Sequence, residues 1–196
     1  MEPVHLCRTI PRPPPGYLTA IPLSYPRGAL QRAAVIIVLV ATPLLLVVAW
    51  LLHDGPPAVL GQADLAQVVQ ALLSLPGTIV IHELLHALVY RCLGYRVSFG
   101  VSAALMAAYA AAFGQWQRRD HNILVALAPV LILTPLAIVC MALPQPALQR
   151  LGFWVALFNT AGSVGDFYLA WRLLRLPHGS LLYDADPQHM YIVMPG

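Results

Sequence analysis

The sequence predicts an all-α integral membrane protein with about four transmembrane helices, a short re-entrant or interfacial strand segment and a small cytoplasmic C-terminal hairpin. Two observations predict this fold class. The 196 residues are 59% hydrophobic and only 10% charged, whereas soluble domains carry about 25% charged residues. Four long apolar stretches also follow one another, and the arginines cluster between alternate pairs of them. This arrangement is typical of a multi-pass protein of the cell membrane.

The first of three expected regions, residues 1–32, is a proline-rich cytoplasmic arm. Proline lacks a backbone donor and interrupts helices, so we expect an extended tether here. A ligand for a proline-binding partner is the alternative. The prolines are Pro3, Pro11, Pro13, Pro14, Pro15, Pro22 and Pro26.

The second region, residues 33–176, is expected to be embedded in the membrane. It opens with the uncharged stretch Ala33 to Leu52, which at 1.5 Å per residue spans the roughly 30 Å hydrocarbon core. Three further apolar stretches are Leu65 to Leu93, Ile123 to Leu143 and Leu151 to Leu174.

The arginines predict that both termini are cytoplasmic. All 11 basic residues are arginine, and with four crossings only Arg150 would lie outside. This distribution follows the positive-inside rule. Because the arginines are scattered in small groups, they do not form the basic patch that binds nucleic acid.

Residues 97–116 are uncharged and nearly long enough to cross the membrane. A fifth crossing would place the arginines on either side of this segment on opposite faces. We therefore expect a re-entrant or interfacial segment that begins as a strand at Val97 to Val101 and packs on protein. In the third region, the tail of residues 177–196, the runs Leu181 to Tyr183 and Met190 to Val193 predict a hairpin.

The motif HELLH, His82 to His86, lies inside the second apolar stretch. Residues four apart share one face of a helix, so His82 and His86 can bind a single ion. Glu83 can then reach a water in an open coordination position. Zinc lowers the pKa of that water to about 7, and the glutamate takes its proton.

Burial favours a metal over a purely structural role for these polar residues. A charged residue in the middle of a membrane helix costs roughly 2.5–3.5 kcal/mol, whereas a structural zinc site returns on the order of 10 kcal/mol. We therefore predict that Zn²⁺ is the cofactor. The alternative is that the two histidines and the glutamate are interhelical hydrogen-bond partners.

Asp166 is the predicted third ligand. It is the only acidic residue inside the apolar stretches besides the glutamate of HELLH. His86 lies five residues before Arg91, and Asp166 lies six before Arg172. At 1.5 Å per residue both would lie roughly 8–9 Å below the cytoplasmic boundary. His121, near the cytoplasmic side, is the alternative ligand.

Asn159 is a further candidate catalytic residue. Asn159, Gly162, Ser163 and Asp166 share one small or polar helix face. Small residues let membrane helices approach closely, so this face is either a packing groove or part of the site. In the second case Asn159 holds the substrate backbone or stabilises an oxyanion.

Three segments together resemble a known family: HELLHALVYRCLGYRVSFG, LVALAPVLILTPL and FNTAGSVGDFYLAWRLLRLPHG. They are similar to a small bacterial and archaeal family of membrane zincin peptidases, distant relatives of the site-2 proteases, which cut substrates within the membrane. The resemblance covers roughly residues 65–183. It implies zinc on His82, His86 and Asp166, with Glu83 as the base. The site-2 protease aspartate usually lies in a proline-containing LDG motif, whereas this chain has no proline there and carries Phe167 in place of glycine.

Two functions therefore remain open. The first is an intramembrane zinc metalloprotease that hydrolyses a peptide bond of a membrane-spanning substrate near its cytoplasmic end. The second is a non-peptidase membrane protein that has a structural zinc site and acts as a scaffold or regulator. Glu83 favours the first, because a structural site has no use for an unpaired carboxylate beside its metal. The expected partners are a membrane protein substrate and the lipid bilayer, and the sequence specifies no oligomeric state.

Overall fold

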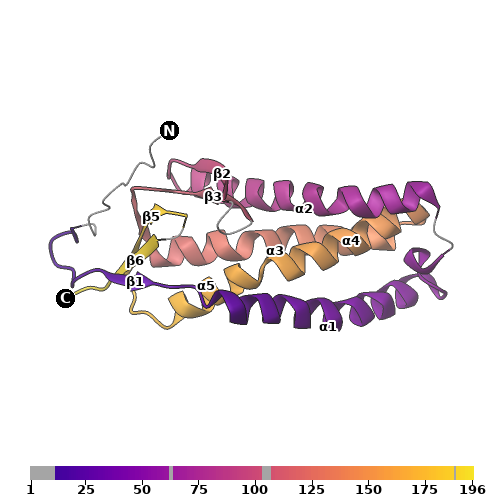
Figure 1. Cartoon of the computed structure of the whole chain (residues 1–196), viewed down its shortest axis with the longest axis horizontal. Coiled ribbons are helices and arrows are strands. Elements are labelled where there is room, and N and C mark those ends of the chain that lie inside the picture. The colour runs from indigo at the N-terminus through magenta and orange to yellow at the C-terminus, as the bar shows by residue number, and fades with distance from the viewer. Residues whose placement is uncertain (1–11, 62–63, 103–106, 188) are drawn as a thin grey trace.

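The computed structural model describes residues 12–61, 64–102, 107–187 and 189–196. The helices of this part of the chain are α1 (Arg27–His53), α2 (Leu65–Cys92), α3 (Arg119–Ala142), α4 (Pro146–Gly162) and α5 (Val164–Leu174), with a short 3-10 helix, η1, at Ala58–Leu60. The strands are β1 (Ile21–Leu23), β2 (Ser98–Ser102), β3 (Ala107–Ala111), β4 (Trp116–Arg118), β5 (Leu181–Asp186) and β6 (His189–Val193). Figure 1 shows the long helices side by side along the longest axis, with β1, β5 and β6 at one end of the bundle.

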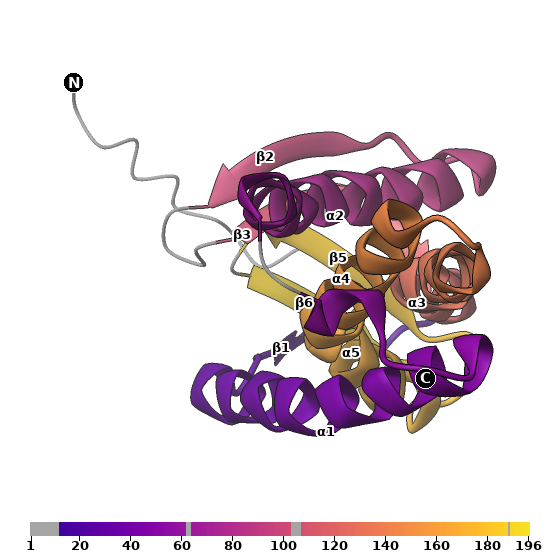
Figure 2. The same ribbon diagram turned by 90° about the vertical axis from the view of Figure 1, so that its right-hand side faces the viewer.

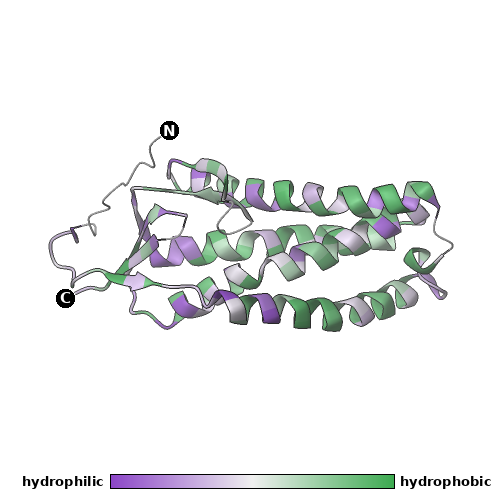
Figure 3. Ribbon diagram, viewed as in Figure 1, coloured by the Kyte–Doolittle hydropathy of each residue, from purple (hydrophilic) through white to green (hydrophobic). Residues whose placement is uncertain are grey.

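Three helices, α1, α2 and α3, are long and apolar enough to cross a membrane. Many of their large apolar side chains are exposed, and the helices are mostly hydrophobic away from the sheet end, as Figure 3 shows. Exposed apolar surface of this extent marks a site of protein or membrane contact. The helices are thus compatible with membrane association.

The fourth predicted span is not one helix. It divides into α4 and α5 at Ser163, and neither helix is among the three that are long and apolar enough to cross. Gly162 and Gly165 flank the break, and glycine disfavours the helix interior. The Ser163 hydroxyl donates to Asn159 O at 2.8 Å. The break places Asp166 in the first turn of α5.

The prediction of an all-α fold is wrong, because the chain forms a mixed α/β structure with two antiparallel sheets. One sheet has four strands in the order β1-β6-β5-β4, and the other pairs β2 with β3. The C-terminal hairpin of β5 and β6 therefore lies in the middle of a larger sheet. In this sheet β1 comes from the proline-rich arm and β4 immediately precedes α3.

The missed strands have weak sequence signals for physical reasons. Strand β1 has three residues and contains Pro22, which an edge strand tolerates because its missing N–H need not join the ladder. Strand β2 begins one residue after the predicted start. Its partner β3 has the sequence AAYAA, and alanine is depleted in strands.

Helices α3 and α4 lie between α1 and α2, as the end view in Figure 2 shows. Helices α3 and α4 approach each other closely at Gly152. A Cβ atom there would collide with Ala137 O and lie 2.7 Å from Met141 N. Small residues allow such approaches between membrane helices. The surrounding core contains Leu45, Ala49, Ala137, Met141, Phe153, Ala156 and Leu157.

We predict that Gly152→Ala destabilises the protein by about 1–3 kcal/mol, because the added methyl group overpacks a backbone contact that cannot yield. The thermal unfolding midpoint in detergent measures the effect. Gly77→Ala is the matched control, since a Cβ at this helical position meets no atom within 4 Å. Equal midpoints for the two variants would contradict the close α3–α4 contact.

Candidate metal centre

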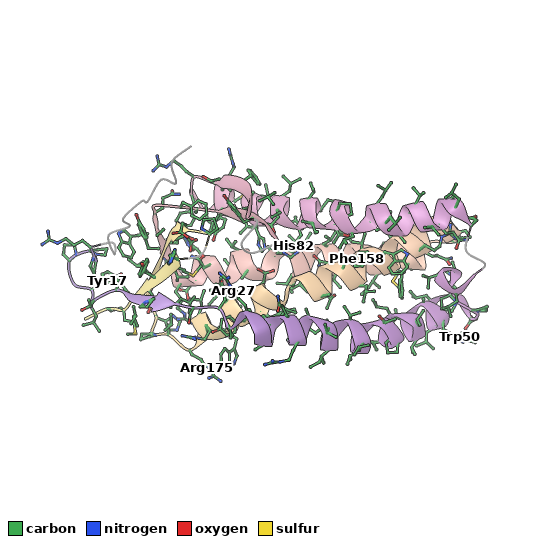
Figure 4. The ribbon with its side chains drawn as sticks, viewed as in Figure 1. Tyr17, Arg27, Trp50, His82, Phe158 and Arg175 are labelled. Carbon is green, nitrogen blue, oxygen red and sulfur yellow. The ribbon has the colours of Figure 1, made fainter. Side chains whose placement is uncertain are left out.

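Helix α2 supplies the two histidines. Its N-terminus is capped by Asp64, whose side chain accepts a hydrogen bond from Gln67 N at 2.7 Å. The helix then continues through HELLH, which places His82 and His86 on one buried face. Their exposed fractions are 8% and 7%. Figure 4 shows His82 between α2 and the helices beneath it, inside the bundle.

The structure brings Asp166 to these histidines. His82 Nε2 lies 3.1 Å from Asp166 Oδ2, and His86 Nε2 lies 3.4 Å from Asp166 Oδ1. The two Nε2 atoms are 3.1 Å apart. Ligand atoms bound at about 2.0 Å in a tetrahedral zinc site are about 3.3 Å from one another. The three side chains therefore have the spacing of ligands around one ion, and this group could bind a metal.

The other ring nitrogens determine which tautomer each histidine adopts. His86 Nδ1 lies 2.9 Å from the carbonyl oxygen of Val125, which can only accept, so Nδ1 carries the proton. His82 Nδ1 lies 2.9 Å from Asn159 Oδ1. The amide orientation of Asn159 follows from its network, since Asn159 Nδ2 donates to Pro129 O at 3.1 Å. Each neutral imidazole therefore presents the bare lone pair of Nε2 to the other and to Asp166.

With both imidazoles neutral, this arrangement brings three electron-pair donors together without a hydrogen between them. Asp166 Oδ2 is buried and has no hydrogen-bond partner among the described residues, although His82 Nε2 is close to it. Buried polar atoms without partners cost free energy. A cation among the three side chains removes this cost, and two imidazoles with one carboxylate suit zinc.

Glu83 lies beside this group and is not part of it. Its Oε2 accepts a hydrogen bond from Ala110 N of β3 at 2.7 Å. The hairpin of β2 and β3 therefore packs along α2 at the level of the motif and fixes one carboxylate oxygen. The Ala110 N–H thus holds one oxygen of a carboxylate that is not part of the group that could bind a metal.

Asn159 is fully buried, and its amide is used within the protein. Its two N–H groups point to Pro129 O and to Thr134 Oγ1, the latter at 2.9 Å. Its oxygen faces His82. Asn159 thus contacts His82 at Nδ1, whereas Asp166 lies near Nε2 of the same ring. Gly162 and Ser163 lie at the break between α4 and α5.

His121 lies apart from the three converging side chains. Its Nδ1 is 2.8 Å from Tyr95 Oη, and it does not belong to the group that could hold an ion. Sequence reasoning missed the partners Val125 O, Thr134 and Ala110 N. Only the first had a usable signal, because a proline four residues later removes the helical donor to that carbonyl.

A sequence model of the family described as "Putative zincin peptidase" matches residues 75–181. The match includes both histidines, Glu83 and Asp166. No curated protein and no solved structure matches the chain.

We predict that the purified protein retains about one Zn²⁺ per chain, as expected for a site with three protein ligands. His82→Ala, His86→Ala and Asp166→Ala should each lose the ion, because two remaining ligands cannot hold it through purification. Elemental analysis by mass spectrometry provides the measurement, and His121→Ala is the matched control that should keep its zinc. Full zinc retention in Asp166→Ala would exclude that carboxylate as a ligand.

Proposed function

Because the chain belongs to the family of zincin peptidases, we propose that it is an intramembrane zinc endopeptidase that hydrolyses a peptide bond of a membrane-spanning substrate near its cytoplasmic end. One observation carries the proposal: His82, His86 and Asp166 converge among helices that include three apolar enough to cross a membrane. A soluble peptidase has no need to place its ligands in such surroundings, whereas a peptidase of membrane segments does.

In this proposal His82, His86 and Asp166 hold the zinc ion. When bound, the ion would supply a Lewis acid that polarises a substrate carbonyl and acidifies a water. Glu83 accepts the proton of the attacking water at Oε1, while Ala110 N–H holds Oε2 in place. Glu83 then delivers that proton to the leaving amine nitrogen as the C–N bond breaks.

Asn159 serves in this proposal to orient His82. Its amide oxygen accepts from His82 Nδ1, and both of its N–H groups are held by α3. Such partners of a ligating histidine fix its tautomer and ring orientation. The role replaces the direct substrate contact expected from the sequence.

Likeness to the site-2 proteases forms part of the same proposal. It is supported by an aspartate from a later helix that meets the HELLH helix, and by the break at Ser163 just before that aspartate. The substrate class that follows is a single-pass membrane protein. A peptide must be extended for hydrolysis, and the short β2–β3 hairpin lies beside the catalytic group where such a segment would enter.

We further propose that the sheet end of the bundle is cytoplasmic. Arg27 and Arg175 lie at that end and Trp50 at the other, as labelled in Figure 4, which agrees with the positive-inside rule. The arm of residues 1–32 and the tail of residues 177–196 then meet on the cytoplasmic side, joined through β1 and β6. Within residues 33–176 the helices form the membrane-embedded region, and β4 belongs to the sheet at the cytoplasmic end.

The topology predicts which cysteines react from outside the cell. In a variant without the native cysteines, Gln145→Cys at the far end of the bundle should be labelled by a membrane-impermeant maleimide. His178 lies at the sheet end and is also exposed. His178→Cys should therefore react only after the membrane is opened. Val101→Cys on β2 should behave like His178→Cys. External labelling at His178 would reverse the orientation, and external labelling at Val101 alone would place the hairpin outside.

Catalysis is tested by Glu83→Gln, which keeps the shape of the side chain and removes its ability to accept a proton. We predict retained zinc and a loss of activity of about 10²–10⁴-fold, as expected for a missing general base. The measurement uses host strains in which each variant is the only copy of the protein. Mass spectrometry quantifies the uncleaved single-pass proteins that accumulate in their membranes.

The comparison with His82→Ala distinguishes the two functions that the sequence left open. Equal accumulation in Glu83→Gln and His82→Ala supports the peptidase. A silent Glu83→Gln together with a defective His82→Ala would mean that the metal holds the fold of a scaffold or regulator, and would reject the proposal.

A further inference from the structure

Helix α3 contains two prolines, Pro129 and Pro135. Proline has no backbone N–H, so the carbonyl four residues earlier loses its donor within the helix. For Pro129 this carbonyl belongs to Val125, a buried residue, and it receives His86 Nδ1 at 2.9 Å. The side chain of His86 thus takes the place of a missing helical donor.

The same proline is also linked to the other histidine, through the side chain of Asn159. Pro129 O accepts a hydrogen bond from Asn159 Nδ2 at 3.1 Å, and Asn159 Oδ1 lies 2.9 Å from His82 Nδ1. Both contacts are fully enclosed, because Pro129 and Asn159 are among the least exposed side chains of the protein. One turn of α3 therefore provides the hydrogen-bond acceptors that orient both imidazoles.

We propose that Pro129 is a positioning residue, and that its missing N–H is the property that matters. The absent donor leaves Val125 O free to hold His86 with Nδ1 protonated and Nε2 directed at Asp166. This inference rests on the proposed metal site and adds to it the backbone feature that selects the histidine tautomer. A residue with an N–H at position 129 would compete with His86 Nδ1 for Val125 O and weaken the hydrogen bond that holds the imidazole.

Pro135 provides the matched comparison. It lies six residues further along the same helix, and the carbonyl that it frees belongs to Leu131, whose side chain is exposed on the outer face. Replacement of either proline by alanine restores one N–H in α3. The carbonyl freed by Pro129, Val125 O, lies 2.9 Å from Nδ1 of a histidine of the metal group.

The test measures zinc affinity in the full-length protein in detergent, by competition with a chromophoric chelator. Pro129→Ala should bind zinc about 10–100-fold more weakly than the unaltered protein, the usual cost of losing a partner of a ligating histidine. Pro135→Ala should retain the original affinity. Equal affinities for the two variants would overturn the inference.

A second variant separates the missing N–H from the shape of the ring. L-lactic acid incorporated at position 129 by nonsense suppression gives an ester with the alanine methyl group and no N–H, and it should restore the affinity lost in Pro129→Ala. An ester variant as weak as the alanine variant would overturn the inference, because the ring and not the absent donor would then be responsible.

A measurement on the unaltered protein covers the case in which Pro129→Ala does not fold. Long-range proton–nitrogen correlation spectra of the zinc-loaded, ¹⁵N-histidine-labelled protein should show His86 with a protonated Nδ1 and the metal on Nε2. Metal on Nδ1 would overturn the inference. If the unaltered protein binds no zinc, the proposed function itself fails; if it binds zinc but Pro129→Ala matches Pro135→Ala, only the role of Pro129 fails.

Discussion

A carboxylate and two imidazoles that lie among apolar helices cost free energy unless each of their polar atoms has a partner. The arrangement of the bundle follows from this constraint. Helix α3 offers Val125 O to His86, and α4 offers Asn159 to His82, so α2 must lie against both helices at one level. Asn159 in turn bonds to α3, which holds α4 in register with it. The polar contacts thus fix relative positions that apolar packing alone would leave free to slide.

The break at Ser163 serves the same constraint from the other side. The interruption between Gly162 and Gly165 gives the chain a new start, and Asp166 falls in the first turn of α5. A carboxylate there is favoured by the positive end of the helix dipole. The same break divides this stretch into helices of 17 and 11 residues, and neither is among the three helices that are long and apolar enough to cross a membrane.

The sequence predicts some parts of this structure well, and physical reasons explain the remainder. Apolar stretches identify α1, α2 and α3, and the spacing of four in HELLH places two imidazoles on one face. The shared depth of His86 and Asp166 brings them to one level, which the distances agree with. The break at Ser163 was missed because glycine and serine are common in membrane helices. Strands β1 and β4 were missed because each has three residues and their partner strands lie far away in the chain.

The pairing of β1 with β6 has a consequence for how the chain is assembled. Ile21 of β1 pairs with Ile192 of β6. In the part of the chain that the structure describes, β1 precedes the helices and β6 follows them. During synthesis β1 has no partner strand until α1 to α5 and then β6 have been made. Contacts between such distant segments carry a large loop-closure cost and form slowly. Packing of the helices shortens that loop in space before the strands meet, because it brings the start of α1 and the end of α5 to the same end of the bundle. We therefore expect β1 and β6 to pair after the helices have packed.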